Sequence, residues 1–97
     1  MRIISKRTLR EFWEKHRDCE QSLLIWYKEI SKNDFFSSQE VKNNFARCRP
    51  IGNNRFIFNI KGNNYRLIVK ISFELQTVWI RFIGTHNEYD KINPNKI

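Results

Sequence analysis

The chain has 97 residues, of which 40% are hydrophobic, and its formal net charge is +8 at pH 7. A chain of this length has room for one hydrophobic core, which buries roughly two thirds of the unfolded surface, so it can fold without a metal or a disulfide. The excess of Lys and Arg favours a nucleic acid, a ribosome, an anionic membrane or an acidic protein as partner, although basic proteins without such a partner also occur.

Nothing in the sequence predicts secretion or membrane insertion. The opening residues, MRIIS, are too few for the apolar part of a signal peptide, and no apolar run approaches the ~20 residues that span a bilayer. Cys19 and Cys48 are isolated and have no metal-ligand spacing to other residues. We therefore expect one cytoplasmic domain over residues 1–97, with free thiols, no metal, no cofactor and no membrane partner.

The N-terminal half predicts a short strand and an antiparallel pair of amphipathic helices. Residues Arg2–Ile4 are β-prone and suit the edge of a sheet, and Ser5 can cap the helix that follows. A second helix is predicted to begin at Asp18, with Gln21 completing a capping box. Each helix has an apolar stripe with the spacing i, i+3, i+4, i+7. The stripes consist of Leu9, Phe12, Trp13 and His16, and of Leu23, Trp26, Tyr27 and Ile30.

A third, shorter helix is predicted from Ser37 to about Phe45. Ser37 can cap it and Glu40 closes the capping box, while Phe36 and Val41 occupy the positions of a hydrophobic staple. Val41 and Phe45 should contact the core. The next residues, 47–53, are predicted to form a linker, because proline interrupts regular structure and glycine permits a turn.

Three runs between residues 55 and 83 alternate with period 2, which predicts three strands of one sheet. A tight turn with Gly62 and Asn63 at its tip joins the first two strands, and its register pairs Asn59 with Arg66. One face of this sheet is apolar. It consists of Phe56, Phe58, Ile60, Tyr65, Leu67, Val69, Ile71, Phe73, Val78, Ile80 and Phe82.

The opposite face of the predicted sheet is largely basic and polar. A second tight turn near Glu74 and Leu75 reverses the chain and places Arg81 beside Ile68 or Lys70. Arg81 then shares a face with Arg66. The alternation predicts the following residues on this face: Arg55, Ile57, Asn59, Arg66, Ile68, Lys70, Ser72, Thr77, Trp79, Arg81 and Ile83.

The segment after the last strand predicts a short helical turn. Thr85 and Glu88 form an S/T-x-x-E capping box, so the turn should begin at His86. His86, Tyr89 and Asp90 then lie at positions i, i+3 and i+4, on one side of the turn. Residues 92–97 are expected to form a disordered tail. The fold class is therefore α+β, with N-terminal helices packed on a twisted, mainly antiparallel sheet of three C-terminal strands plus a short N-terminal strand.

The polar side chains near this sheet suit RNA cleavage without a metal. Arg66 and Arg81 can bind a phosphate and stabilise the charge that develops during attack by a 2′-hydroxyl. His86 can transfer a proton near neutral pH, Tyr89 can stack on a base, and Asp90 can orient the histidine. The same residues also fit a structural interpretation, with solvated surface charges, a surface histidine and a tyrosine packed on the sheet edge.

Stretches distributed over nearly the whole chain point to a family. They are Arg2–Ser5, Leu9–Trp13, Trp26–Tyr27, Val41–Lys42, Phe56–Val69 and Ile80–Asp90. Together they resemble the HigB-type toxins of the RelE superfamily, which are mRNA interferases of bacterial toxin–antitoxin pairs. The resemblance implies a RelE-like fold and cleavage of mRNA on the translating ribosome. It also implies a HigA-like helix-turn-helix antitoxin, through which operator DNA is bound only indirectly.

The resemblance also assigns roles to individual residues. Arg66 and Arg81 match arginines that bind phosphate and stabilise the transition state, and Tyr89 matches a C-terminal aromatic residue. His86 and Asp90 match polar positions of the family's tail. Lys61 matches a basic residue near the first hairpin. The residues expected to bind RNA are Lys61, Asn59, Lys70 and Asn63.

Two other functions fit the same composition. One is a non-catalytic basic RNA-binding domain, which has helices and a three-stranded sheet, but this chain lacks the lysine-rich final helix of double-stranded RNA binders. The other is a protein-interaction subunit whose basic face binds an acidic partner.

Overall fold

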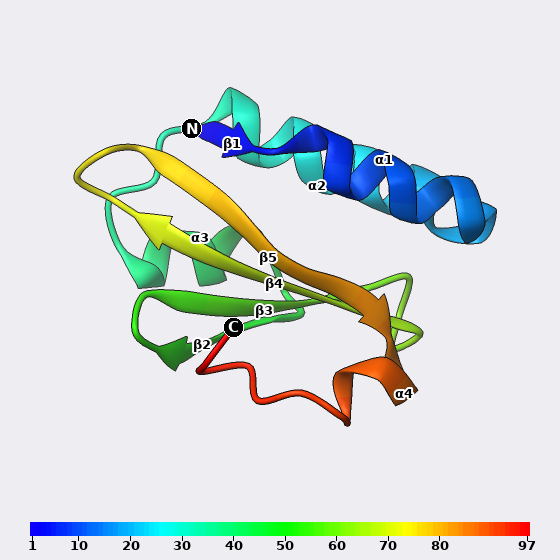
Figure 1. Ribbon diagram of the computed structural model, residues 1–97. Coiled ribbons are helices and arrows are strands. Elements are labelled where there is room, and N and C mark those ends of the chain that lie inside the picture. Colours follow the sequence, from blue (N-terminus) through cyan, green and yellow to red (C-terminus); the bar gives the residue numbers. More distant parts are fainter.

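The computed structural model describes residues 1–97, whose framework is one five-stranded sheet (Figure 1). The strand order is β1-β5-β4-β3-β2, with β1 parallel to β5 and all other neighbours antiparallel. The strands are β1 (Arg2–Ile4), β2 (Cys48–Gly52), β3 (Arg55–Ile60), β4 (Tyr65–Ser72) and β5 (Thr77–Thr85). The helices are α1 (Lys6–Lys15), the 3₁₀ turn η1 (Arg17–Cys19), α2 (Glu20–Lys32), α3 (Ser38–Asn44) and α4 (His86–Tyr89). The predicted α+β class is confirmed, with one strand more than expected.

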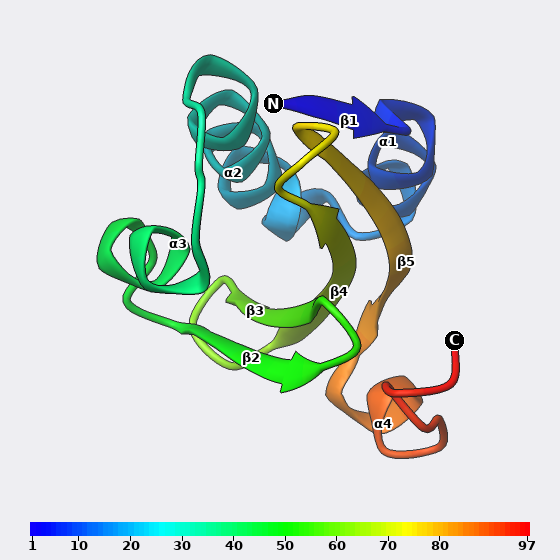
Figure 2. The ribbon, with the colours of Figure 1, turned by 90° about the vertical axis from the view of Figure 1, so that its left-hand side faces the viewer.

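The core lies between the sheet and the N-terminal helices. Figures 1 and 2 show α1 and α2 on one side of the curved sheet and α4 on the other. The fully buried members of this core include Phe56, Phe58, Leu9, Leu23, Ile30, Val41, Leu67, Val69, Ile71 and Val78. Cys19 and Cys48 are buried and unbonded to each other. None of the helices combines the length and apolar character that a membrane crossing requires.

We call the sheet surface that faces away from α1 and α2 the outer face. Residues paired across antiparallel strands point to the same side, so the strand pairing defines its rows. The rows are Asn59–Arg66–Gly84, Arg49–Ile57–Ile68–Phe82 and Arg55–Lys70–Trp79. Each row therefore contains at least one basic residue, and the placement of Arg55, Arg66 and Lys70 on this face agrees with the alternation of β3 and β4.

The β3–β4 hairpin has the predicted register. Asn59 pairs with Arg66, and the pairs on both sides follow the alternation of the sequence. The strands end one residue before the expected turn on each side, so residues 61–64 form the connection. Gly62 and Asn63 are still at its centre, where the Asn64 N–H donates to the Lys61 carbonyl over 3.3 Å.

A bulge in β5 corrects the predicted face of its second half. Ile68 pairs with Phe82 and Val69 pairs with Ile80, so Arg81 is an extra residue without a partner on β4. An extra residue reverses the alternation beyond it. Phe82 therefore belongs to the outer face, and Ile83 packs against the core, opposite to the prediction for both residues.

The predicted linker over residues 47–53 is wrong, because Cys48–Gly52 forms the edge strand β2. An edge strand tolerates proline, since one side of its backbone needs no partner in the sheet. The register shifts between Pro50 and Gly52, and Gly52 has φ 93°, so the glycine allows the strand to end in an irregular turn.

Two predicted helix starts also need correction. Asp18 does not cap α2, because its carboxylate accepts a hydrogen bond from Tyr65 Oη over 2.6 Å and lies 3.6 Å from Lys61 Nζ. This hydrogen bond is the main cause that lowers the pKa of Asp18 and raises the pKa of Tyr65 to about 12. Phe36 does not form a staple, since it is 66% exposed while Phe35 is buried.

The other predicted helix signals have mixed outcomes. Ser37 caps α3, because its side chain accepts from the Glu40 N–H. In a regular capping box the Glu40 side chain would accept from the Ser37 N–H, but here it accepts from the N–H of the preceding residue, Phe36. Ser5 precedes α1 at the N-cap position, but its side chain makes no cap hydrogen bond. After α4, the chain turns back along the sheet, and the Ile97 carbonyl accepts from Arg55 Nε over 3.0 Å.

Candidate functional site

The capping box predicted at Thr85 fixes α4 to the end of β5. The Glu88 N–H donates to Thr85 Oγ1 over 3.2 Å, and the Thr85 N–H donates to Glu88 Oε1 over 2.8 Å. The hydrogen bond from the Thr85 backbone holds the pKa of Glu88 below its ordinary value. Because both ends of the box are joined, α4 begins at a defined angle beside the outer face.

Tyr89 lies between two arginines from different strands. The guanidinium carbon of Arg66 is 5.7 Å from the centre of the Tyr89 ring, within the range of a cation–π contact. Arg49 Nη2 donates to Tyr89 Oη over 3.2 Å. The ring is therefore held from two directions, by β4 and by the edge strand β2.

The β3–β4 hairpin holds Arg66 by one of its nitrogens. Arg66 Nη1 donates to the Asn63 carbonyl over 2.7 Å and to the Tyr65 carbonyl over 3.3 Å. The Asn63 side chain in turn accepts from Asn59 Nδ2 over 3.0 Å and from Arg47 Nη1 over 3.4 Å. Arg66 Nε and Nη2 have no hydrogen bond within the protein, so these donors can bind an external anion.

His86 and Asp90 form an exposed pair on α4. His86 Nδ1 lies 3.1 Å from Asp90 Oδ2, and the two side chains are 53% and 57% exposed. The His86 ring is 6.4 Å from the Tyr89 ring, at an angle of 81°. The three predicted residues of this turn therefore lie together, and His86 Nε2 makes no hydrogen bond within the protein.

A shallow cavity of about 150 Å³ extends this site toward the sheet edge. Arg47, Arg49 and Asn59 are among the residues that line it. Two guanidinium groups beside an amide form a suitable surface for a phosphate, because arginine binds phosphate oxygens with pairs of parallel N–H groups.

The sequence of residues 19–92 matches a described protein family, HigB_toxin, the RelE-like toxic component of a toxin-antitoxin system. The chain belongs to the HigB toxin family. It is 30% identical over 94 residues to the mRNA interferase HigB of Escherichia coli O6:H1, which covers 95% of this chain and 91% of that protein. It is 28% identical to the mRNA interferase toxin HigB of E. coli K12 over 92 residues, 93% of this chain and 88% of that protein. The mRNA interferase HigB of Shigella flexneri matches to the same extent. The resemblance identified in the sequence is thereby confirmed.

In this HigB-family fold, the predicted site residues do not all lie together. Arg66, Tyr89, His86 and Asp90 form one cluster, and Asn59 and Asn63 support Arg66. Lys70 is on the outer face, in the row between Arg55 and Trp79. Lys61 is outside the cluster, since it pairs with Asp18 beside η1.

Arg81 occupies the bulge of β5, next to the outer-face row of Ile68 and Phe82. Its side chain is exposed and has no hydrogen bond or ion pair with the cluster around Tyr89. Bulges redirect side chains and are frequent beside active sites.

Arg49 was not among the predicted site residues, although its Nη2 donates to Tyr89 Oη in the structure. Arg49 lies within residues 47–53, for which the sequence predicts a linker and the structure shows strand β2. Its signal would have been the period-2 pattern of Arg47, Cys48, Arg49 and Pro50, in which buried Cys48 alternates with exposed neighbours. This alternation covers only a few residues, and Pro50 within it is unfavourable for a strand.

Proposed function

We propose that this HigB-family toxin is a ribosome-dependent endoribonuclease that cuts translated mRNA. The observation that carries the proposal is the position of Tyr89, an aromatic ring between Arg66 and Arg49 on a basic sheet face. Proteins recognise single-stranded RNA by stacking bases on aromatic rings while cationic groups contact the phosphates. The names of the relatives, which are mRNA interferases, support the same conclusion.

In the proposed reaction, the 2′-oxygen of a nucleotide attacks its own 3′-phosphate, and the bond from phosphorus to the next 5′-oxygen breaks. The 2′-hydroxyl loses one proton and the 5′-oxygen gains one, so the products are a 2′,3′-cyclic phosphate and a 5′-hydroxyl. Negative charge grows on the phosphorane oxygens, and guanidinium groups beside them lower the barrier. We assign this role to Arg66, Arg49 and Arg81.

We assign proton transfer to His86, with Asp90 orienting its ring through Nδ1. A positioned acid or base of this kind contributes about 10²–10⁴ in rate. We expect the reaction to need no metal, because the arginines supply the positive charge that a metal supplies in other nucleases. The ribosome would hold the RNA in line for attack, which explains how a site with few proton-transfer groups can act quickly.

Expression in bacteria tests the proposal. The wild-type chain should arrest growth and cut mRNA within codons, and Arg66→Ala should reduce the cleavage rate by about 10²–10³, as for the loss of one donor to a charged transition state. Arg10→Ala is the matched control, since it removes the same charge from the exposed side of α1. Normal growth while folded protein accumulates would rule the proposal out.

The proposed partner is a HigA-like antitoxin with a helix-turn-helix motif, which would connect the toxin to operator DNA indirectly. A neighbouring small gene encoding such a protein should abolish growth arrest when it is expressed together with the toxin. Continued arrest in the presence of the folded neighbour protein would remove it as the antitoxin.

A further inference from the structure

The outer face contains two buried apolar side chains that the helices α1 and α2 do not cover. Ile57 and Ile68 pair with each other in the central row of this face, and they are only 2% and 0% exposed. Neither belongs to the core cluster that lies between the sheet and these helices. Their burial therefore requires a cover on the outer face itself.

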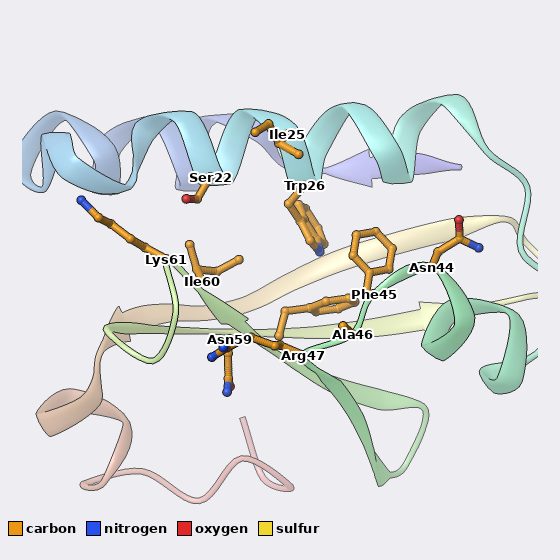
Figure 3. A pocket seen from close by; sticks show the side chains of 11 residues that line it. Ser22, Ile25, Trp26, Asn44, Phe45, Ala46, Arg47, Asn59, Ile60 and Lys61 are labelled. Carbon is orange, nitrogen blue, oxygen red and sulfur yellow. The ribbon is translucent and has the colours of Figure 1, made fainter.

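The segment after α4, residues 93–97, lies on that side of the sheet, and we call it the strap. Figures 1 and 2 show the strap turning back on the side where α4 lies. Figure 3 shows Trp26 and Phe45 on the helical side of the sheet and the strap on the opposite side. Pro94 and Ile97 of the strap are half-buried, while its other three residues are exposed. Such a division is expected when a segment packs its apolar side chains against a surface.

The hydrogen bonds between the strap and the sheet all involve one arginine. The Ile97 carbonyl accepts from Arg55 Nε over 3.0 Å and from Arg55 Nη2 over 2.5 Å. The remaining nitrogen, Arg55 Nη1, donates to the Asn53 carbonyl over 3.4 Å. The chain's own carbonyl groups thus engage all three nitrogens of Arg55, whereas Arg66 has two free nitrogens. The other hydrogen bonds of the strap are internal, so it can leave without breaking a strand.

Arg55 would otherwise extend the basic surface that begins at the candidate site. It pairs with Lys70 on the outer face, and strands β2–β5 contain no Asp or Glu that could neutralise this pair. Arg66 lies opposite Asn59, which is four residues from Arg55 on β3. Four residues of a strand span about 13 Å, which a stacked single strand of RNA covers in about four nucleotides. A strand that contacts Arg66 therefore reaches Arg55 when it is only a few nucleotides longer.

We propose that the strap occupies an RNA-binding position at Arg55 and leaves it when a long single strand binds across the outer face. A phosphate of that strand then replaces the Ile97 carbonyl on Arg55 Nε and Nη2, since a charged acceptor forms the stronger hydrogen bonds with a guanidinium. The strap carries no carboxylate, so the released segment does not repel the RNA. The inference rests on the proposed function, because RNA bound at Tyr89 supplies the strand that reaches Arg55.

The experiment measures the affinity of 2′-O-methyl RNA by calorimetry, because this RNA has no free 2′-hydroxyl and cannot be cut. A probe of about three nucleotides reaches only the site at Tyr89, and a probe of about ten nucleotides also reaches Arg55. Deletion of residues 93–97 should tighten binding of the longer probe about threefold or more at low salt and leave the shorter probe unchanged. It should also steepen the salt dependence of the longer probe by about 0.7, as expected for one more phosphate contact on a single strand. The deletion removes the positive charge of Lys96, so tighter binding cannot result from added charge.

Three further variants locate the effect. Arg55→Ala in the deleted chain should abolish the gain for the longer probe, because it removes the uncovered guanidinium. Asn95→Ala is the matched control within the strap, since Asn95 is exposed and its side chain makes no hydrogen bond, and it should bind both probes as the wild type does. The double substitution Pro94→Gly with Ile97→Gly keeps the length and charge of the strap and weakens its packing. It should give a smaller gain in the same direction even if the deleted chain does not fold.

The outcomes separate this proposal from the proposed function. An unchanged or weaker affinity for the longer probe in both the deleted chain and the double glycine variant would overturn the strap, and so would a gain that persists with Arg55→Ala. Tighter binding of the longer probe by a chain that cuts no mRNA on ribosomes contradicts the nuclease activity and leaves the strap in place. Cleavage of mRNA by a chain whose strap has no effect on RNA binding contradicts the strap alone.

Discussion

Tyr89 offers the sharpest test of the site, because its hydroxyl and its ring make separate contacts. Tyr89→Phe removes only the hydroxyl that accepts from Arg49 over 3.2 Å. A hydrogen bond of this kind at an exposed position contributes about 0.5–1 kcal/mol, so the cleavage rate should fall about two- to fivefold. Tyr89→Ala also removes the ring that lies 5.7 Å from the Arg66 guanidinium.

The larger truncation should therefore have a much larger effect. The contact of the half-buried ring with Arg66 contributes about 0.5–1 kcal/mol, and a base stacked on the ring contributes about 1–3 kcal/mol. Together with the lost hydroxyl, Tyr89→Ala should lose about 2–5 kcal/mol of transition-state stabilisation, which is roughly 30-fold to several thousand-fold in rate. Most of this loss comes from the stacked base.

The assay is the initial rate of cleavage of one defined mRNA in a purified translation system. Tyr27→Phe is the matched control, since Tyr27 is a half-buried tyrosine of α2 whose ring contacts Lys6 instead. Thermal unfolding should show that all variants remain folded. A rate for Tyr89→Ala within threefold of the wild type would place Tyr89 outside the site. Equal losses for Tyr89→Phe and Tyr89→Ala would show that the hydroxyl acts in the reaction and that stacking contributes little.

Three further predictions concern the surroundings of Tyr89 and the joint between η1 and β4. Arg49→Ala should lower the cleavage rate about tenfold or more without loss of folding, since it removes a charge from the proposed phosphate surface, and circular dichroism with the cleavage assay checks both parts. Gly84→Ala places a Cβ 2.5 Å from Phe82 Cζ and 3.1 Å from Glu88 Oε1. It should displace α4 and reduce cleavage by up to about 10²-fold, and a cleavage rate equal to that of the wild type would contradict this role of Gly84. Tyr65→Phe should remove an ultraviolet titration step at about pH 12, because the hydrogen bond to Asp18 raises the pKa of Tyr65 from 10.0 to about 12. The hydrogen bond between Tyr65 and Asp18 stabilises the folded protein fully below pH 10, and this stabilisation is lost as the pH rises toward 12 and Tyr65 ionises. It is also lost as the pH falls below 3.8 and Asp18 becomes protonated, because the pKa of Asp18 is lowered in the folded state. The variant should therefore lose less stability than the wild type in both ranges, as urea unfolding at several pH values can show.

The sequence predicts the pairing of the central strands β3 and β4 correctly, but it does not predict the edge strand β2 or the bulge in β5. Strict alternation in β3 and β4, together with the glycine turn, fixed the pairing of Asn59 with Arg66, because a slip by one residue would expose the whole apolar set. The run from Ile80 to Ile83 has apolar residues on both sides of Arg81, so the alternation fits either face and the bulge leaves no clear local pattern. The edge strand β2 depends on pairing with β3, and the proline within it favours the opposite interpretation.

The site was predictable to a similar extent. The box of Thr85 and Glu88 is a local signal, and it correctly brought His86, Tyr89 and Asp90 together on one turn. The contact of Arg49 with Tyr89 joins residues that are distant in the sequence, and it exists only because β2 completes the sheet. Lys61 illustrates the same limit, since its partner Asp18 comes from a part of the chain that the hairpin alone does not reveal.

The parallel pairing of β1 with β5 affects the order in which the protein can fold as it is synthesised. Arg2 pairs with Thr77, so β1, the first strand to be synthesised, cannot pair in the sheet until β5, the last strand, has been made. Contacts between such distant parts of a chain form late in folding. Tyr89 and His86 follow directly after that last strand and leave the ribosome later still. The chain therefore cannot assemble its candidate site before residues 86–89 have been synthesised and have left the ribosome.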